Sequence, residues 1–161
     1  MKNSDSLNKD GKSAARSARR AVEQMLAKDS FSAWLGIELI EVRPGYAAIS
    51  MTVRNEMLNG FELCHGGIPF SLADSALAFA ANTHGRVSLS VEAGMAYASP
   101  IKSGDVLSAV AEEQSSTHRT GIYTVVVARQ DGAKVAFFRG TVYRTDRNLF
   151  DDQQGGGDGH L

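Results

Sequence analysis

Residues 59–81 place a polar, glycine-rich loop directly before a run of alanine, leucine and phenylalanine. Gly66, Gly67 and Pro69 mark the start of a helix, because proline is tolerated in a first turn and glycine lets the backbone approach a ligand closely. We expect this helix to be buried and to end near Gly85, since small and apolar side chains dominate it. The rest of the chain must then cover it.

One carboxylate, Asp74, interrupts this apolar run. It lies six residues beyond Ile68, or about 9 Å along a helix axis. Its small apolar neighbours predict desolvation, which raises the pKa of a carboxyl group and makes it a stronger base. A structural interpretation also exists, in which Ser71 or Ser75 of the same helix satisfies the carboxylate. The residues alone leave both interpretations open.

The segments outside this helix show the two-residue alternation of half-buried strands. A hairpin is expected from residues 37–42 and 46–53, joined by a turn at Pro44 and Gly45. Further strands are expected at residues 87–98, 106–112, 122–129 and 134–144. The pattern predicts an α+β fold, with about six antiparallel strands packed against one long helix. Uncovered strand edges also predict self-association.

The two ends of the chain carry no strong apolar pattern. Residues 1–12 and 148–161 are expected to be disordered tails that flank a single domain at residues 13–147. From Ser13 the apolar residues recur at helical spacing, which predicts an extra amphipathic helix before the strands. Asp29 and Ser30 predict a short capped turn that leads into Gly36.

Composition argues against several classes of protein. The formal net charge is -1, so neither nucleic acid nor a membrane is expected as a partner. Cys64 is the single cysteine and no apolar run reaches 18 residues, which favours a cytoplasmic protein without disulfides. The four histidines lack zinc-ligand spacing and no nucleotide-binding glycine motif occurs, so neither a metal nor a cofactor is predicted.

Six short motifs occur in an order and spacing that resembles the hotdog-fold thioesterases, in the branch around the phenylacetate-degradation thioesterase PaaI. The motifs are Met57-Leu58-Asn59-Gly60, Cys64-His65-Gly66-Gly67, Phe70 to Asp74, the Ser-Gly-Asp turn before Val106, Thr120-Gly121 and Phe138-Arg139-Gly140. The resemblance covers residues 34–145. It implies a sheet wrapped around the long helix, active sites at a dimer interface, and a homotetramer built from two dimers.

The resemblance also implies roles for the residues of the loop and the helix. Asp74 would activate water or attack the thioester carbon, and the backbone N–H of Gly66 from the opposite subunit would polarise the thioester oxygen. Asn59 would position water or the acyl group. Ser75 stands where relatives often carry threonine, a hydroxyl that orients the water. Coenzyme A belongs to the substrate, so no cofactor is implied.

Four further residues complete the predicted substrate-binding set: Gly67, Lys102, Arg119 and Thr120. Relatives often carry an arginine before the proline at position 100, where this chain has serine, so contact with the coenzyme A phosphates is assigned to Lys102 or Arg119.

His65 and Cys64 invite a catalytic interpretation that we do not favour. A neutral imidazole at a helix start caps the loop, so a positioning role is preferred for His65. The adjacent Cys64 is interpreted as a small buried side chain, because neighbours in sequence rarely face one another.

The chemistry of the loop agrees with the resemblance on independent grounds. A helix N-terminus carries about half a positive charge and open N–H groups, so it stabilises a carbonyl oxygen that becomes an oxyanion. A thiol with a pKa near ~8.5 leaves without a general acid, so one base and one oxyanion site suffice.

We therefore expect an acyl-CoA thioester hydrolase that acts on aromatic groups such as phenylacetyl or hydroxyphenylacetyl, or on medium-chain groups, as in phenylacetate catabolism. Two alternatives remain open at this point: an acyl-CoA binding or sensing module without turnover, and an enoyl-CoA hydratase or dehydratase on the same fold.

Overall fold

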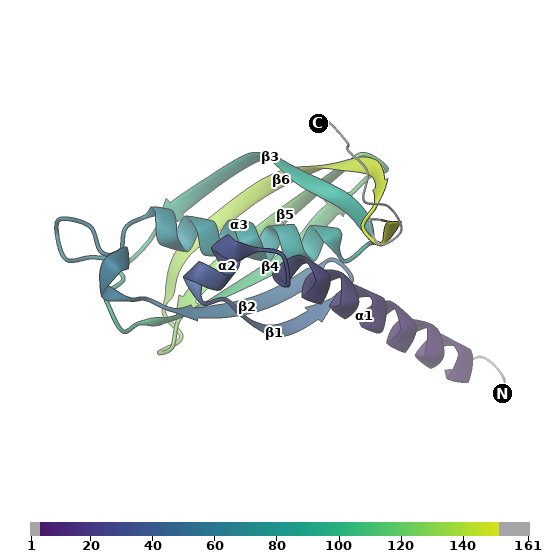
Figure 1. Ribbon diagram of the computed structural model, residues 1–161, viewed down its shortest axis with the longest axis horizontal. Helices are drawn as coiled ribbons and strands as arrows, with labels where there is room; N and C mark the ends of the chain where they lie inside the picture. Colours follow the sequence, from purple (N-terminus) through teal and green to yellow (C-terminus); the bar gives the residue numbers. More distant parts are fainter. Residues whose placement is uncertain (1–3, 152–161) are drawn as a thin grey trace.

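The alanine-rich segment forms α3 (Gly67–Asn82), which lies along one face of a six-stranded sheet (Figure 1). The computed structural model describes residues 4–151. Ala73, Ala76 and Ala80 are fully buried, and their small size lets the helix approach the strands closely. The helix ends three residues before the predicted position, because Gly85 adopts a left-handed conformation (φ 79°) in the turn to the next strand.

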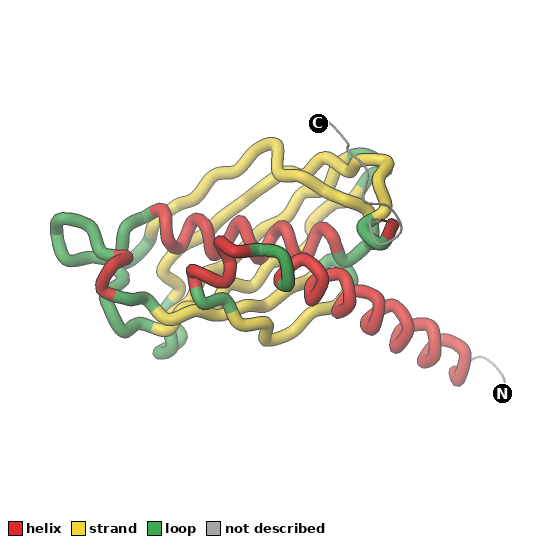
Figure 2. The backbone as a smooth tube through the Cα atoms, in the orientation of Figure 1, coloured by secondary structure: helices red, strands yellow, loops and turns green. Residues whose placement is uncertain are grey.

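The sheet is antiparallel throughout. Its strands are β1 (Glu38–Arg43), β2 (Tyr46–Thr52), β3 (Arg86–Tyr97), β4 (Val106–Ser116), β5 (Thr120–Arg129) and β6 (Lys134–Asn148). Their order across the sheet is β1-β2-β4-β5-β6-β3, so β1 and β3 form its two edges (Figure 2). The predicted hairpin of β1 and β2 is confirmed, and β4, β5 and β6 run further than the sequence pattern predicts.

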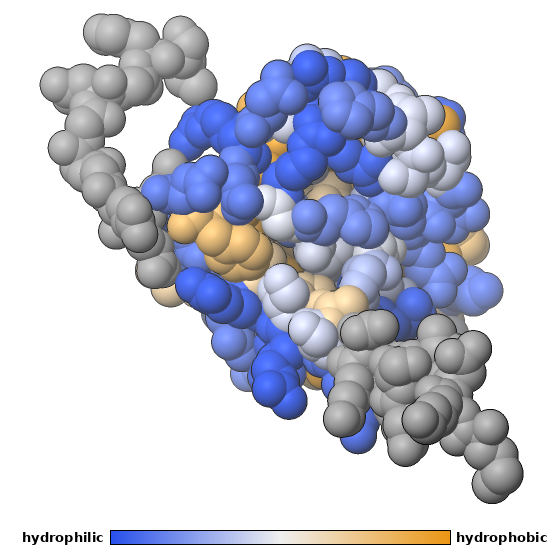
Figure 3. Space-filling model, turned by 90° about the vertical axis from the view of Figure 1, so that its right-hand side faces the viewer, coloured by the Kyte–Doolittle hydropathy of each residue, from blue (hydrophilic) through white to orange (hydrophobic). Residues whose placement is uncertain are grey.

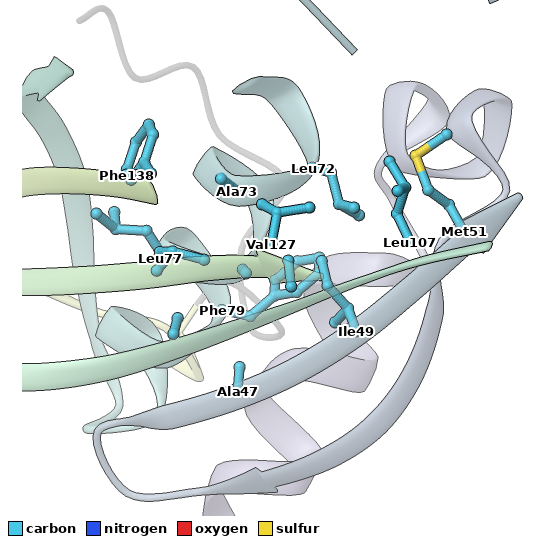
Figure 4. Packing of buried hydrophobic residues seen from close by; sticks show 14 of the residues in the cluster. Ala47, Ile49, Met51, Leu72, Ala73, Leu77, Phe79, Leu107, Val127 and Phe138 are labelled. Atoms are coloured by element: carbon cyan, nitrogen blue, oxygen red, sulfur yellow. The ribbon is translucent and has the colours of Figure 1, made fainter. Parts of the chain in front are cut away.

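The hydrophobic core lies between α3 and the inner face of the sheet (Figure 4). Leu72, Leu77 and Phe79 of α3 meet strand residues that include Ile49 and Val127, and all five are buried. Gly140 of β6 lies against this helix, since a Cβ atom there would approach Leu77 Cδ1 to 2.5 Å. The one-helix α+β architecture predicted from the sequence is confirmed.

A long helix, α1 (Ser4–Leu26), packs on β1 and α3 and extends beyond the sheet (Figure 1). Ala18, Ala21 and Val22 are its buried contact residues. The predicted boundary of the N-terminal tail at residue 12 is wrong, because the helix already begins at Ser4. Once a helix is formed, each added residue contributes one further hydrogen bond. The helix can therefore extend into residues that show no apolar face in the sequence. Residues 1–3 lie outside the described part.

The predicted capped turn is the short helix α2 (Ser30–Leu35). The Asp29 carboxylate accepts hydrogen bonds from the N–H groups of Phe31 and Ser32, and Gly36 ends the helix in a left-handed conformation (φ 76°). A single 3-10 turn, η1 (Asn55–Met57), leads from β2 into the loop before α3. Both short elements lie beside the start of α3.

The predicted start of the C-terminal tail at residue 148 is also wrong. Asn148 belongs to β6, and the N–H of Leu149 donates to the Gly85 carbonyl. The Phe150 ring lies 4.9 Å from the guanidinium carbon of Arg20 on α1. These contacts join segments far apart in sequence, so a local pattern does not indicate them. Residues 152–161 lie outside the described part, and the assignment of residues 13–147 to one domain stays a prediction.

Candidate active site

Asn59 shapes the loop that precedes α3. Its side-chain oxygen accepts hydrogen bonds from the N–H groups of Phe61 (2.9 Å) and Leu63 (3.2 Å). An antiparallel bridge between Leu58 and Cys64 closes the base of the loop. Since the oxygen is occupied by the loop itself, the amide nitrogen of Asn59 is the group that remains for a ligand.

The peptide N–H groups at the start of α3 differ in their partners. The N–H of Gly67 donates to His65 Nδ1 at 2.9 Å, and the N–H of Ile68 donates to the His65 carbonyl at 2.9 Å. The N–H of Gly66 donates to no group within residues 4–151. A carbonyl oxygen placed at this helix entrance therefore has a backbone donor at Gly66, but not at Gly67, which the sequence predicts to bind substrate.

His65 makes the contact expected of a capping imidazole. Its Nδ1 accepts the hydrogen bond from Gly67, so this nitrogen carries no proton in the arrangement seen here. The same residue accepts a second helix-start N–H through its carbonyl oxygen. Both contacts order the peptide that carries the Gly66 N–H.

Asp74 lies two turns further along α3 and contacts the edge strand β3. Its Oδ1 accepts a hydrogen bond from the Ser90 hydroxyl at 3.1 Å. No hydrogen bond joins Asp74 to Ser71 or Ser75 among the described residues, so the same-helix partners considered from the sequence are not used. Sequence analysis missed Ser90, because only the tertiary contact between helix and strand brings it to the carboxylate.

Tyr97, at the other end of β3, contacts the helix entrance. Its hydroxyl donates to the Gly66 carbonyl at 2.9 Å. A Cβ atom at position 66 would lie 3.2 Å from that hydroxyl oxygen and 3.3 Å from the ring, so a glycine fits here without displacement. The strand β3 therefore touches both the carboxylate and the backbone donor of the predicted site.

Two hollows flank the start of α3, each of about 340 Å³. The first opens toward β3 and is lined by Asn59, Leu63, Cys64, Gly66, Pro69 and residues 97–101. The second opens toward α2 and is lined by Phe31, Trp34, residues 56–58, His65, Gly67, Ile68 and Ser71. The segment from His65 to Gly67 separates them. A larger hollow on α1 lies among exposed arginines and shares no residue with the predicted site.

The cations predicted to contact coenzyme A lie at opposite ends of the sheet. Lys102 is exposed and follows Ile101, which lines the first hollow. Arg119 lies in the β4–β5 hairpin and pairs with Asp146 at 2.7 Å.

That hairpin adjoins the C-terminal end of α3, since Arg86 donates to the His118 carbonyl beside it. Thr120 lies in the same hairpin and contacts the Thr117 hydroxyl, so the fold does not bring it or Arg119 to the loop of their own chain. Figure 3 looks at this end of the molecule, whose surface is mostly hydrophilic with small apolar areas.

The surroundings of the Cys64 thiol disfavour its thiolate form. Burial, and secondarily the charge of Asp105, raise the pKa of Cys64 to about 11.

Within the described part of the chain no three His, Cys, Asp or Glu side chains gather closely enough to bind a metal ion. No described helix is both long and apolar enough to cross a membrane.

Known proteins share this loop, helix and sheet. Residues 61–136 match the family model described as the thioesterase superfamily. The chain is 38% identical to acyl-coenzyme A thioesterase PaaI of Escherichia coli over 120 residues, which are 74% of this chain and 86% of that protein. The chain belongs to the thioesterase superfamily, in its PaaI-like branch. It is also 31% identical over 96 residues to human acyl-coenzyme A thioesterase 13, covering 58% of this chain and 69% of that one.

Solved structures of this branch superpose on the chain. The E. coli PaaI protein from the phenylacetic acid degradation operon gives a TM-score of 0.82 at 34% identity, covering 83% of this chain and 97% of that one. A mutant of the phenylacetic acid degradation protein PaaI from Thermus thermophilus gives 0.70 at 37% identity, covering 73% and 100%. The hotdog fold is confirmed, and the expected acyl-CoA thioester hydrolase is confirmed at the level of the family.

Proposed function

We propose that this protein hydrolyses acyl-CoA thioesters at a site formed between two copies of the chain, with Asp74 from one copy and Gly66 from the other. The observation that carries the proposal is the N–H of Gly66 at the entrance of α3, which has no partner among residues 4–151, on the helix that also carries the Ser90-bonded Asp74. A backbone donor at a helix N-terminus is suited to an oxyanion, and a nearby carboxylate is suited to water activation.

The two groups cannot serve one thioester within a single chain. They are eight residues apart on the same helix, or about 12 Å along its axis. Reacting atoms must approach to about 3–3.5 Å, and the oxyanion donor must contact the same carbonyl. A second copy of the chain is therefore needed to bring an Asp74 to each Gly66.

The edge strand β3 is suited to join the copies. It spans 12 residues that are mostly exposed, including Leu89 at 53% and Val91 at 62%. A long apolar edge of this kind pairs with another strand unless it is blocked. Antiparallel pairing of two β3 strands about an axis near Ala93 and Gly94 would set the Asp74 end of one copy beside the Gly66 end of the other. The predicted association of two such dimers into a tetramer stays a prediction.

The proposed reaction uses one base and one oxyanion donor. Asp74 either takes a proton from the attacking water or attacks the thioester carbon itself, and the carbonyl oxygen becomes an oxyanion that accepts the Gly66 N–H. The C–S bond then breaks, and coenzyme A leaves as a thiolate because its pKa is near ~8.5. On the nucleophilic route a water molecule then hydrolyses the acyl-Asp74 anhydride and restores the carboxylate. On either route the products are a free acid and coenzyme A. Cytoplasmic location and a role in phenylacetate breakdown belong to the same proposal, which the PaaI relatives support.

Release of free thiol from acetyl-, octanoyl-, benzoyl- and phenylacetyl-CoA tests the activity. Asp74→Ala and Asp74→Asn are expected to lower kcat by at least about a hundredfold, while Asp151→Asn, an exposed carboxylate near the chain end, serves as the control. Full activity in both Asp74 variants contradicts the mechanism. Binding of coenzyme A esters without hydrolysis across the panel would indicate a binding module instead.

Mixing two inactive variants tests the shared site. Asp74→Ala and Gly66→Val each damage both sites of their own dimer, but a mixed dimer contains one site with both native residues. Random mixing of refolded subunits is expected to restore about a quarter of the wild-type activity. If no activity returns although mixed dimers form, the two residues do not act across subunits.

A further inference from the structure

The hollow between α2 and the start of α3 has no role in the chemistry described above. Its volume is about 340 Å³, and its walls come from α2, η1 and the first turn of α3. Most of the lining side chains are apolar: Phe31, Trp34, Met57, Leu58 and Ile68. Glu56 also lines it, but this carboxylate pairs with Arg54 at 2.5 Å, so its charge is compensated. The hollow is thus suited to an uncharged, apolar group.

Two exposed aromatic rings form one wall of this hollow. The rings of Phe31 and Trp34 are stacked, with centroids 6.1 Å apart and an interplanar angle of 18°. They remain 50% and 48% exposed, although large aromatic side chains are normally buried. A stacked and half-exposed pair presents a flat apolar surface to a ligand.

The backbone beneath this pair is fixed at both ends. Asp29 caps the start of α2, and Gly36 closes its end. Arg54 donates to the carbonyl of Trp34 at 2.8 Å, and its guanidinium carbon lies 5.3 Å from the Trp34 ring centroid. The aromatic wall is therefore positioned before any ligand binds, which favours selective binding.

The hollow adjoins the segment that carries the proposed oxyanion donor. His65 and Gly67 line it, and they are the two neighbours of Gly66, whose N–H has no partner in the described part of the chain. Gly66 itself lines the first hollow, on the other side of the same segment. A thioester with its carbonyl oxygen at this N–H directs its two substituents away from each other. The first hollow, with Asn59 and Ser99 in its wall, suits the polar pantetheine arm, which leaves the apolar hollow for the acyl group.

We infer that the acyl group binds in the hollow beside α2, and that the Phe31–Trp34 pair selects planar aromatic acyl groups over linear chains of the same carbon number. This inference rests on the proposed thioesterase function. A cavity of ~150 Å³ accommodates benzene, so a phenylacetyl group fits within the volume seen here. The aromatic contact is expected to contribute a factor of about ten in selectivity.

The test compares phenylacetyl-CoA with octanoyl-CoA, which carry acyl groups of eight carbons each. Trp34→Ala is expected to lower kcat/KM for phenylacetyl-CoA by about tenfold and to change kcat/KM for octanoyl-CoA by less than about threefold. Trp34→Phe is expected to retain most of the preference for phenylacetyl-CoA over octanoyl-CoA. Phe137→Ala on β6, which removes an aromatic ring that is 44% exposed, is the matched control and leaves the ratio unchanged.

A second variant keeps the inference testable if Trp34→Ala does not fold. Ser71→Trp adds a large side chain to the wall of the hollow, and is expected to raise KM for both eight-carbon substrates while acetyl-CoA, whose acyl group is small, is still hydrolysed. If these variants leave the substrate preference unchanged, the acyl group binds elsewhere.

If Trp34→Ala instead dissociates the assembly and lowers all activities alike, the aromatic pair contacts another copy of the chain and the inference is wrong. If the wild-type protein hydrolyses none of the esters, the proposed function itself is wrong. This result differs from an unchanged substrate preference and from dissociation of the assembly.

Discussion

Glu113 of β4 joins the C-terminal end of α3 to the sheet, at the end away from the helix entrance. Its carboxylate accepts hydrogen bonds from the Tyr123 hydroxyl (2.5 Å) and from Arg144 (2.9 Å), and lies 2.8 Å from His84 Nε2. The Arg144 side chain is only 6% exposed and also donates to Ser116 and to the backbone of the β4–β5 hairpin. We predict that this cluster makes a large contribution to the free energy of unfolding.

Glu113→Gln removes the negative charge and keeps the shape of the side chain. Arg144 then remains buried without a counter-charge, and breaking a buried ion pair in this way costs about 3–5 kcal/mol. Because the Glu113 side chain is 21% exposed, we expect a value near the lower limit, about 3 kcal/mol. Tyr123→Phe deletes one hydroxyl from a buried ring without leaving a cavity, and should cost about 1–2 kcal/mol.

The same cluster predicts a pH dependence. Burial raises the pKa of Glu113, but the hydrogen bonds from Tyr123 and His84 and the charges of His84 and Arg144 outweigh it, so the pKa lies below its ordinary value. A carboxyl with a lowered pKa in the folded state stabilises the fold above its unfolded pKa of ~4.3, and this stabilisation is lost as the pH falls through the folded value. Acidification should therefore destabilise the wild type more steeply than Glu113→Gln.

Urea unfolding followed by circular dichroism at pH 7, 5, 4 and 3 measures both effects. Protein concentration must be equal in all samples, because an associating chain has a concentration-dependent stability. A loss below about 1 kcal/mol in Glu113→Gln at pH 7, or identical pH slopes for the two proteins, would show that the Arg144 charge is satisfied without Glu113.

Three further predictions concern single side chains. Ser90→Ala should lower kcat by about tenfold through loss of the hydroxyl bonded to Asp74, the proposed catalytic carboxylate; thiol release measures this, and an unchanged kcat contradicts the assignment. Gly140→Ala should lower the free energy of unfolding by about 1–3 kcal/mol, because the added Cβ would lie 2.5 Å from Leu77 Cδ1; an unchanged melting temperature argues against it. Cys64 should react with iodoacetamide at pH 8 about a hundredfold more slowly than free cysteine, since burial raises its pKa to about 11; equal rates refute this.

The fold could be predicted because its main signals are local. An apolar helix behind a glycine-rich loop and period-2 strands are properties of short segments, and β5 shows the expected alternation of buried and less buried residues. Element ends were predicted less well where distant contacts determine them. The hairpin at the ends of β4 and β5 is bonded by Arg144 of β6, which lies 24 residues from Thr120.

The residues of the candidate site also fall into those visible from a local pattern and those placed by distant contacts. Asn59, His65 and Gly66 lie within one loop, and their turn and capping chemistry is visible in the sequence. Ser90 and Tyr97 meet their partners only after the chain has crossed to the far edge of the sheet, 16 and 31 residues away from Asp74 and Gly66. The motif around Thr120 carries no information about which end of the sheet it occupies, and its assignment to the substrate site stays a prediction.

An irregularity in β3 allows the strand to contact both halves of the site. Residues seven positions apart point to opposite faces of a regular strand, yet Ser90 and Tyr97 both bond to groups of α3 or its entrance. The register between β3 and β6 shifts between Ser90 and Glu92, which inserts Val91 as an extra residue and restores a common face.

Deletion of Val91 should therefore turn either Ser90 or Tyr97 away from α3 and lower kcat by at least about tenfold, whereas Val91→Ala keeps the residue count and the activity. Thiol release from a folded deletion variant measures this. Wild-type kcat after the deletion would mean that catalysis does not depend on the two strand contacts.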